Sequence, residues 1–104
     1  IQNEPTQFQL VLYAIMKLES HKNHGQIFTG DVYNMYQEIC SKSKNEVLTQ
    51  RRIGDIIAEF DMLGIINANI ISKGRQGRTK EIRLMLASNI KDKAFGILKD
   101  SLGI

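Results

Sequence analysis

The spacing of apolar residues changes at Gly64, and this change restricts the folds that the chain can adopt. Before Gly64, a threonine suited to cap a helix, Thr49, is followed by apolar residues at helical spacing: Ile53, Ile56, Ile57, Phe60 and Leu63. Gly64 itself is typical of a helix C-terminus. After it, residues 66–71 and 81–86 alternate with the period of a β-strand. The sequence therefore predicts a helix followed by a β-hairpin.

The two predicted strands are defined by that alternation. In the first strand Ile66, Ala68 and Ile70 alternate with Asn67, Asn69 and Ile71, and in the second Ile82, Leu84 and Leu86 alternate with Glu81, Arg83 and Met85. The intervening stretch is rich in glycine and basic residues, so it is predicted to form the tip of the hairpin.

Three further segments have helical spacing. Residues 6–20 predict a first helix with an apolar stripe at Phe8, Leu12, Ile15 and Leu18. A second helix is predicted to begin at Thr29, as its N-cap, and to bury Val32, Met35, Tyr36 and Ile39. A short last helix is predicted over residues 89–101, burying Ile90, Ala94, Ile97 and Leu98.

Three helices followed by a hairpin are the elements of a winged helix-turn-helix. The predicted fold class is thus mainly α with a small β-hairpin, namely a three-helix core, a wing and a short C-terminal helix. With 104 residues, the chain has the size of one such domain, which we place at residues 1–104. Because the first residue is Ile1 and not Met, we expect a domain excised from a longer protein.

Basic charge is concentrated in the predicted wing. Residues 72–83 hold five basic residues against one acidic residue, Glu81, a local charge of +4: Lys73, Arg75, Arg78, Lys80 and Arg83. The whole chain carries +3, which leaves −1 for everything else. A basic patch on a nearly neutral body indicates a polyanion bound at one place.

The helix after Thr49 is the candidate recognition helix. Gln50, Arg51 and Arg52 fill its first turn, where the helix dipole disfavours positive charge and where helix-turn-helix proteins reach base edges. Helical spacing turns Arg51, Asp55, Ala58 and Met62 outward. Gly54 and Ala58 are small enough to let this helix lie close to a groove floor. The alternative is a solvated ion pair between Arg51 and Asp55.

At the wing, Gly74 and Gly77 allow the positive φ values of a tight hairpin, so Arg75 and Arg78 would project from a thin tip. Arginine on a slender support suits the narrow, electronegative minor groove. Lys73, Lys80 and Arg83 would then meet phosphates. The alternative is a solvated loop whose basic residues serve solubility.

Several other functions find no support in the sequence. The two wing glycines lie between predicted strands and no Gly-Lys-Ser/Thr occurs, so a nucleotide-phosphate loop is not predicted. His21 and His24 have only Cys40 as a further soft ligand, too few for a zinc site, and we expect Cys40 to be a helix residue near the core. No catalytic constellation is present, so we predict no enzyme. No apolar run has the length of a membrane span, and no signal peptide is recognisable.

Residues 48–84, together with TGDVYNMYQEIC at 29–40, resemble the C-terminal winged-helix domain of archaeal replication initiators related to the origin recognition complex and the cell-division-cycle loader. The combination of TQRR, MLGII and GRxGRTKEI carries the resemblance. It implies sequence-specific binding of double-stranded DNA at replication origins, with the recognition helix in the major groove and the wing in the minor groove. By position, the helix start corresponds to Thr49, Gln50, Arg51 and Arg52, and the wing to Gly74, Arg75, Gly77 and Arg78.

The resemblance also implies partners and cofactors. Members of this family carry an AAA+ ATPase module, so we expect ATP and Mg²⁺ to bind only in that missing module and no cofactor in this chain. Origin DNA is the expected partner, with the replicative helicase or other initiator copies as further possibilities, and the isolated domain is expected to be monomeric. The expected location is the cytoplasm, at the nucleoid.

Two other functions stay open at this point. One is a winged helix that docks a protein, such as a helicase or another initiator, through an exposed apolar patch around Met62, Met85 or the last helix. The other is a winged-helix transcriptional regulator, which would usually carry a dimerisation helix that this sequence lacks.

Overall fold

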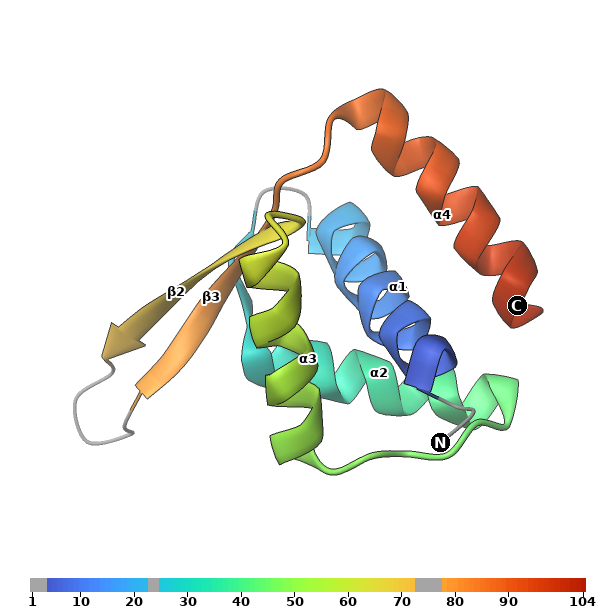
Figure 1. The fold of residues 1–104 in the computed structure, drawn as a ribbon, viewed down its shortest axis with the longest axis horizontal. Helices are drawn as coiled ribbons and strands as arrows, with labels where there is room; N and C mark the ends of the chain where they lie inside the picture. Colours follow the sequence, from blue (N-terminus) through green and yellow to red (C-terminus); the bar gives the residue numbers. More distant parts are fainter. Residues whose placement is uncertain (1–3, 23–24, 73–77) are drawn as a thin grey trace.

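The computed structural model describes residues 4–22, 25–72 and 78–104. Its elements follow the order α1 (Glu4–Lys22), β1 (Ile27–Phe28), α2 (Thr29–Ser43), α3 (Gln50–Met62), β2 (Ile66–Ser72), β3 (Arg78–Leu84) and α4 (Ser88–Leu102). Figure 1 shows α1, α2 and α3 packed together, with the β2–β3 hairpin projecting on one side and α4 lying on the other. The predicted winged-helix architecture is confirmed.

The hairpin belongs to a three-stranded antiparallel sheet in the order β1-β3-β2. Strands β2 and β3 pair from Ile66 opposite Leu84 to Ser72 opposite Arg78. The two residues of β1 pair with β3, placing Ile27 opposite Ile82. The sequence did not predict β1, because two residues are too short to show a period. This strand joins the wing directly to the start of α2.

The core is built around α1, which contacts α2, α3, α4 and the sheet. Because it has neighbours on several sides, α1 buries more than one stripe: Leu10, Val11, Tyr13, Ala14, Ile15, Met16 and Leu18. Phe8 and Leu12 from the predicted stripe are only partly buried. The predicted faces of α2 and α3 are confirmed at Val32, Tyr36, Ile39, Ile53, Ile56, Ile57 and Phe60.

The predicted N-cap was wrong for α2 and was confirmed for α3. Helix α2 does begin at Thr29, but its N-cap is Phe28, whose backbone N–H donates to Asp31 Oδ2 at 3.0 Å. Helix α3 begins as predicted, since Thr49 Oγ1 accepts the Arg52 N–H at 3.2 Å. It ends at Met62, and Gly64 follows with φ +78°, so Leu63 is an exposed C-cap residue and not part of the buried face.

The predicted buried stripe of the last helix was wrong at Ile90 and Ile97 and was confirmed at Leu98. Ile97 is 62% exposed and Ile90 is also exposed, whereas Phe95 stacks on Tyr13 with ring centroids 4.9 Å apart. Of the other helices, α4 makes its main contacts with α1, and one apolar stripe suffices for that contact. This stripe runs through Ala94, Phe95, Leu98 and Leu102. Lys91, one turn before Phe95, forms an ion pair with Glu19 at 3.0 Å.

Candidate nucleic-acid interface

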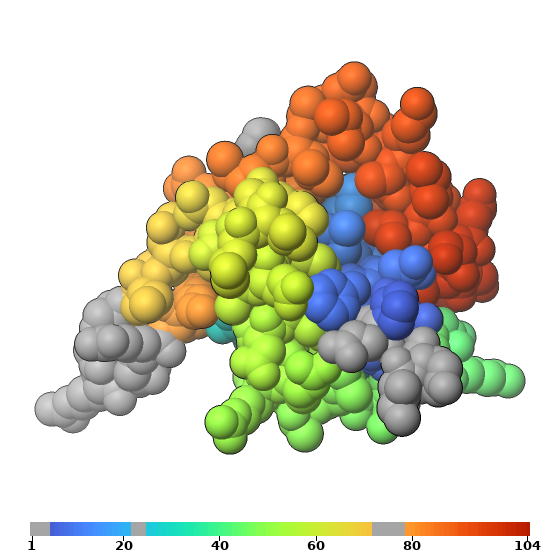
Figure 2. Space-filling view, in the orientation of Figure 1, coloured from blue at the N-terminus to red at the C-terminus, as the bar shows by residue number. Residues whose placement is uncertain are grey.

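The face of helix α3 that was predicted to point outward lies beside the hairpin, and Ala58 on this face is half-buried. Arg51, Asp55 and Met62 are exposed, and Met62 is 87% accessible. In the space-filling view, α3 stands at the surface with the hairpin projecting next to it (Figure 2). Within the described residues, Arg51 and Asp55 form no ion pair, so the alternative that used Arg51 for a surface pair does not occur in this structure.

The turn that leads into α3 is held by two tyrosines of α2. Tyr33 Oη donates to the Leu48 carbonyl at 2.9 Å, and the Leu48 N–H donates to Tyr36 Oη at 2.7 Å. Both backbone groups of the residue that precedes Thr49 are therefore fixed by side chains. Because Thr49 caps α3, this anchoring determines where the first turn of α3 lies.

A buried glutamine completes the network. Tyr36 Oη donates to Gln7 Oε1 at 2.7 Å, and Gln7 Nε2 donates to the Glu46 carbonyl at 3.0 Å. Gln7 is 2% exposed, and burial raises the pKa of the Tyr36 phenol well above its usual range. Sequence reasoning missed these roles, because Tyr36 was predicted only as an apolar contact and Gln7 gave no periodic signal.

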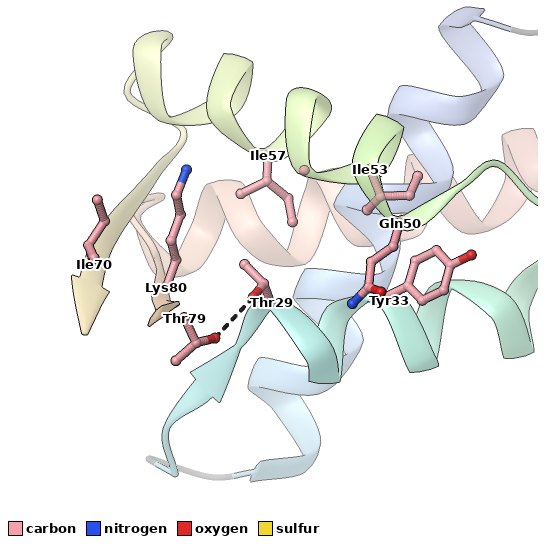
Figure 3. Close-up of a pocket in the computed structure, with 9 residues that line it drawn as sticks. Thr29, Tyr33, Gln50, Ile53, Ile57, Ile70, Thr79 and Lys80 are labelled. Carbon is pink, nitrogen blue, oxygen red and sulfur yellow. Dashed lines mark hydrogen bonds between the residues drawn. The ribbon is translucent and has the colours of Figure 1, made fainter. Parts of the chain in front are cut away.

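The structure describes the side chains of only some of the residues that were predicted for the wing. Lys80 lies opposite Ile70 in the β2–β3 pair, on the face of the hairpin that is turned toward α3 (Figure 3). Arg83 lies an odd number of residues away, so it occupies the opposite face, with Nε 3.8 Å from Glu81 Oε2. Lys73, Gly74, Arg75 and Gly77 lie outside the described residues. For Arg78 the structure describes only the backbone, which pairs with Ser72.

A hollow of about 280 Å³ separates α3 from the hairpin. It is lined by residues of α2, α3, β2 and β3: Thr29, Tyr33, Gln50, Ile53, Gly54, Ile57, Ile70, Thr79 and Lys80. Figure 3 shows Lys80 and Ile70 on the hairpin side, and Thr29 hydrogen-bonded to Thr79 through their Oγ1 atoms at 3.1 Å. Ile70 is 63% exposed, because β2 extends past the helical core at this point.

Other candidate chemistry is not assembled among residues 4–22, 25–72 and 78–104. Those residues contain no group of three or more His, Cys, Asp or Glu side chains placed to hold a metal ion, and His24 lies outside them. Cys40 is buried, as predicted, and burial raises the pKa of its thiol. None of the described helices is long and apolar enough to cross a membrane.

These features define a winged-helix domain with an accessible third helix and a wing beside it. Residues 1–94 match the family model described as CDC6, C terminal winged helix domain, and the chain belongs to this family of replication-initiator winged helices.

Similar proteins come from archaea. The chain is 58% identical over 80 residues to ORC1-type DNA replication protein 7 of Halobacterium salinarum, covering 77% of this chain and 15% of that protein. It is 53% identical over 88 residues to the ORC1-type DNA replication protein of Pyrococcus furiosus, covering 85% of this chain and 21% of that protein. The chain therefore spans about a fifth or less of the length of these relatives.

Solved structures agree with this assignment. The Aeropyrum pernix ORC1 protein in complex with DNA matches 90% of this chain and 23% of that protein chain, with a TM-score of 0.78 and 36% identity. The structure of Cdc6p from Pyrobaculum aerophilum, with a TM-score of 0.71 and 14% identity, covers 92% of this chain and 24% of that chain and supports the fold alone.

Proposed function

We propose that this domain binds double-stranded DNA sequence-specifically at replication origins, with α3 in the major groove and the β2–β3 wing in the adjacent minor groove. The observation that carries the proposal is that the first turn of α3, with exposed Gln50 and Arg51, lies beside the hairpin, whose Lys80 lines the same hollow as Gln50. A related ORC1 protein that shares this fold has been solved in complex with DNA, which supports the same partner here.

The division of labour follows from the geometry. Gln50 and Arg51 have the side chains that pair with adenine and guanine edges in the major groove. Lys80 and the basic residues of the wing supply positive charge for phosphates and for the narrow minor groove. Asp55 lies one turn after Arg51 on the exposed face, where it repels phosphates, so we assign that face to bases and not to the backbone.

Fluorescence anisotropy with an origin duplex and a scrambled duplex, each at two salt concentrations, tests this function. We expect tighter binding to the origin duplex and a log–log salt slope of about −4, corresponding to about four neutralised phosphates. Equal affinity for the two duplexes would remove the claim of sequence specificity. No measurable binding to either duplex at low salt would remove the claim of DNA binding.

A second candidate function is docking of a protein, such as the helicase or another initiator copy. Met62, Leu63 and Met85 are all exposed near the base of the hairpin, where the Met85 N–H donates to the Ile65 carbonyl at 2.9 Å. Exposed apolar residues that cluster in this way are typical of interaction surfaces. Self-association in sedimentation experiments that the double variant Met62→Ser/Met85→Ser abolishes would favour this function.

A further inference from the structure

We propose that the hollow between α3 and the hairpin holds one sugar–phosphate unit of the DNA strand that separates the major groove from the minor groove. This inference rests on the proposed function and adds to it three contacts that the sequence did not indicate: Thr29, Thr79 and Ile70. It also gives Gly54 a more specific role than closeness to a groove floor.

The hollow lies at the position where the backbone of a bound duplex would pass. Adjacent major and minor grooves are separated by a single sugar–phosphate backbone, so a protein that enters both must be crossed by that backbone between its two reading elements. Gln50 and Gly54 of α3 line one side of the hollow, and Ile70 and Lys80 of the hairpin line the other (Figure 3). The hollow thus lies where the strand must pass.

The lining suits a sugar–phosphate unit in both of its parts. Ile70, which is 63% exposed, provides apolar surface that a deoxyribose ring could bury, whereas Ile53 and Ile57 lie buried at the base of the hollow. Lys80, Thr29 and Thr79 provide positive charge and hydroxyl groups for the phosphate. None of the residues that line the hollow is a carboxylate, so its charge is complementary to the backbone.

The threonine pair leaves a hydrogen available. Each hydroxyl has one hydrogen, and the bond between the two Oγ1 atoms at 3.1 Å uses one of them. The other hydrogen remains for an acceptor such as a phosphate oxygen. Thr29 is also the first residue of α2, where the helix dipole favours negative charge.

Gly54 lies on the α3 side of the hollow, where the lack of a side chain would let a DNA strand approach the helix closely. Glycine inside a helix is disfavoured relative to alanine, yet a Cβ added at Gly54 would meet no atom within 4 Å beyond its chain neighbours and the backbone of its own helix. Its φ is not positive, so neither packing nor backbone conformation within the protein requires glycine at this position. Close approach of the DNA backbone would require it. Gly96 of α4 is equally open but lies across the molecule from the hairpin, which makes it a matched control.

The first experiment modifies the DNA and leaves the protein intact. A duplex recovered by this chain from a random-sequence pool is remade with single methylphosphonate linkages, each of which removes one phosphate charge. We expect a single position on the strand between the two grooves to weaken binding about tenfold when neutralised, as for loss of a hydrogen bond to a charged group. If the wild-type chain binds the duplex and no methylphosphonate on that strand weakens binding, the proposed binding of a sugar–phosphate unit in the hollow is overturned. The proposed function of DNA binding would still stand.

The second experiment asks which side chains hold that phosphate. The double variant Thr29→Val/Thr79→Val and the variant Lys80→Met should each lose affinity for the unmodified duplex. Each should also lose part of its sensitivity to the methylphosphonate at the critical position. In Lys80→Met the log–log salt slope should become shallower by about 0.9. Full sensitivity retained in folded variants would overturn the assignment of these residues.

Substitutions of Gly54 and Gly96 test the close approach of DNA to α3 without changing a hydroxyl group or a charge. Gly54→Ala and Gly96→Ala should both raise the melting temperature, because alanine favours a helix. Only Gly54→Ala should weaken DNA binding, and Gly54→Leu should weaken it further. Equal affinity of Gly54→Leu and wild type would overturn the close approach. If the wild-type chain binds no duplex, both the proposed function and the proposed binding of a sugar–phosphate unit in the hollow are overturned.

Discussion

The phenol of Tyr36 accepts the Leu48 N–H at 2.7 Å and donates to Gln7 Oε1 at the same distance. One side chain of α2 therefore ties the turn before α3 to the first turns of α1. Because Leu48 immediately precedes the α3 cap, the position of the candidate reading helix depends on a buried hydrogen bond as well as on apolar packing.

Replacing Tyr36 with phenylalanine should leave the Leu48 N–H and Gln7 without their partner in a buried position. We expect the free energy of unfolding to fall by about 2 kcal/mol, the usual cost of an unsatisfied buried polar group. Urea denaturation would measure the loss. Tyr33→Phe is the matched control, because Tyr33 is only partly buried and its hydroxyl makes a single bond to the Leu48 carbonyl, so its loss should be smaller. Equal effects would contradict the assigned role of Tyr36.

The same phenol should make stability depend on alkaline pH. Burial raises the pKa of Tyr36 in the folded chain, so above the unfolded-state value of about 10 only the unfolded state loses this proton. The stabilising contribution is complete below that pH and falls above it by about 1.4 kcal/mol per pH unit. Unfolding free energies of wild type and Tyr36→Phe, measured from neutral to alkaline pH, should therefore converge. Parallel curves would contradict the shift.

Arg51 should contribute to both affinity and specificity for DNA. Its side chain is exposed in the first turn of α3, and Arg51→Ala should weaken binding to a preferred duplex by about 1–3 kcal/mol while narrowing the difference from a scrambled duplex. Anisotropy titrations would measure both quantities. Lys93→Ala removes the same charge from the exposed surface of α4, across the molecule from the hairpin, and should have little effect. A uniform loss in both variants would indicate only a general electrostatic attraction.

Phe95 should be the main apolar anchor of α4. Its ring stacks on Tyr13, so Phe95→Ala should lower the free energy of unfolding by about 3 kcal/mol. Ile97→Ala alters a residue that is 62% exposed and should change stability by less than about 0.5 kcal/mol. Thermal unfolding of the two variants would check this. A larger loss of stability in Ile97→Ala than in Phe95→Ala would instead support the buried stripe through Ile97 that the sequence predicted.

Local signals made much of the fold predictable. In α3 the Thr49 cap, the period of the isoleucines and the Gly64 stop all lie within one segment, and each was confirmed. The β2–β3 hairpin followed from two alternating segments on either side of a stretch rich in glycine and basic residues. In α4, two stripes compete within the same helix, and only the position of Tyr13 on α1 selects the one containing Phe95.

The candidate interface was predictable only in part, because its remaining residues are brought together by long-range contacts. Gln7 and Tyr36 lie 29 positions apart, and Thr29 and Thr79 lie 50 apart. Neither pair leaves a periodic pattern in the sequence. The exposure of Ile70 was also hidden, since alternation gives the face of a strand but not where the core beneath it ends.

The two residues of β1 have a consequence for how the molecule would respond to DNA. They are continuous with α2 and hydrogen-bonded to β3, and Thr29 is bonded to Thr79 just beyond them. The hairpin therefore cannot swing away from the helical core without breaking these bonds. In a complex the distance between α3 and the hairpin would therefore stay fixed. A duplex whose groove spacing did not match this distance would itself have to twist or bend.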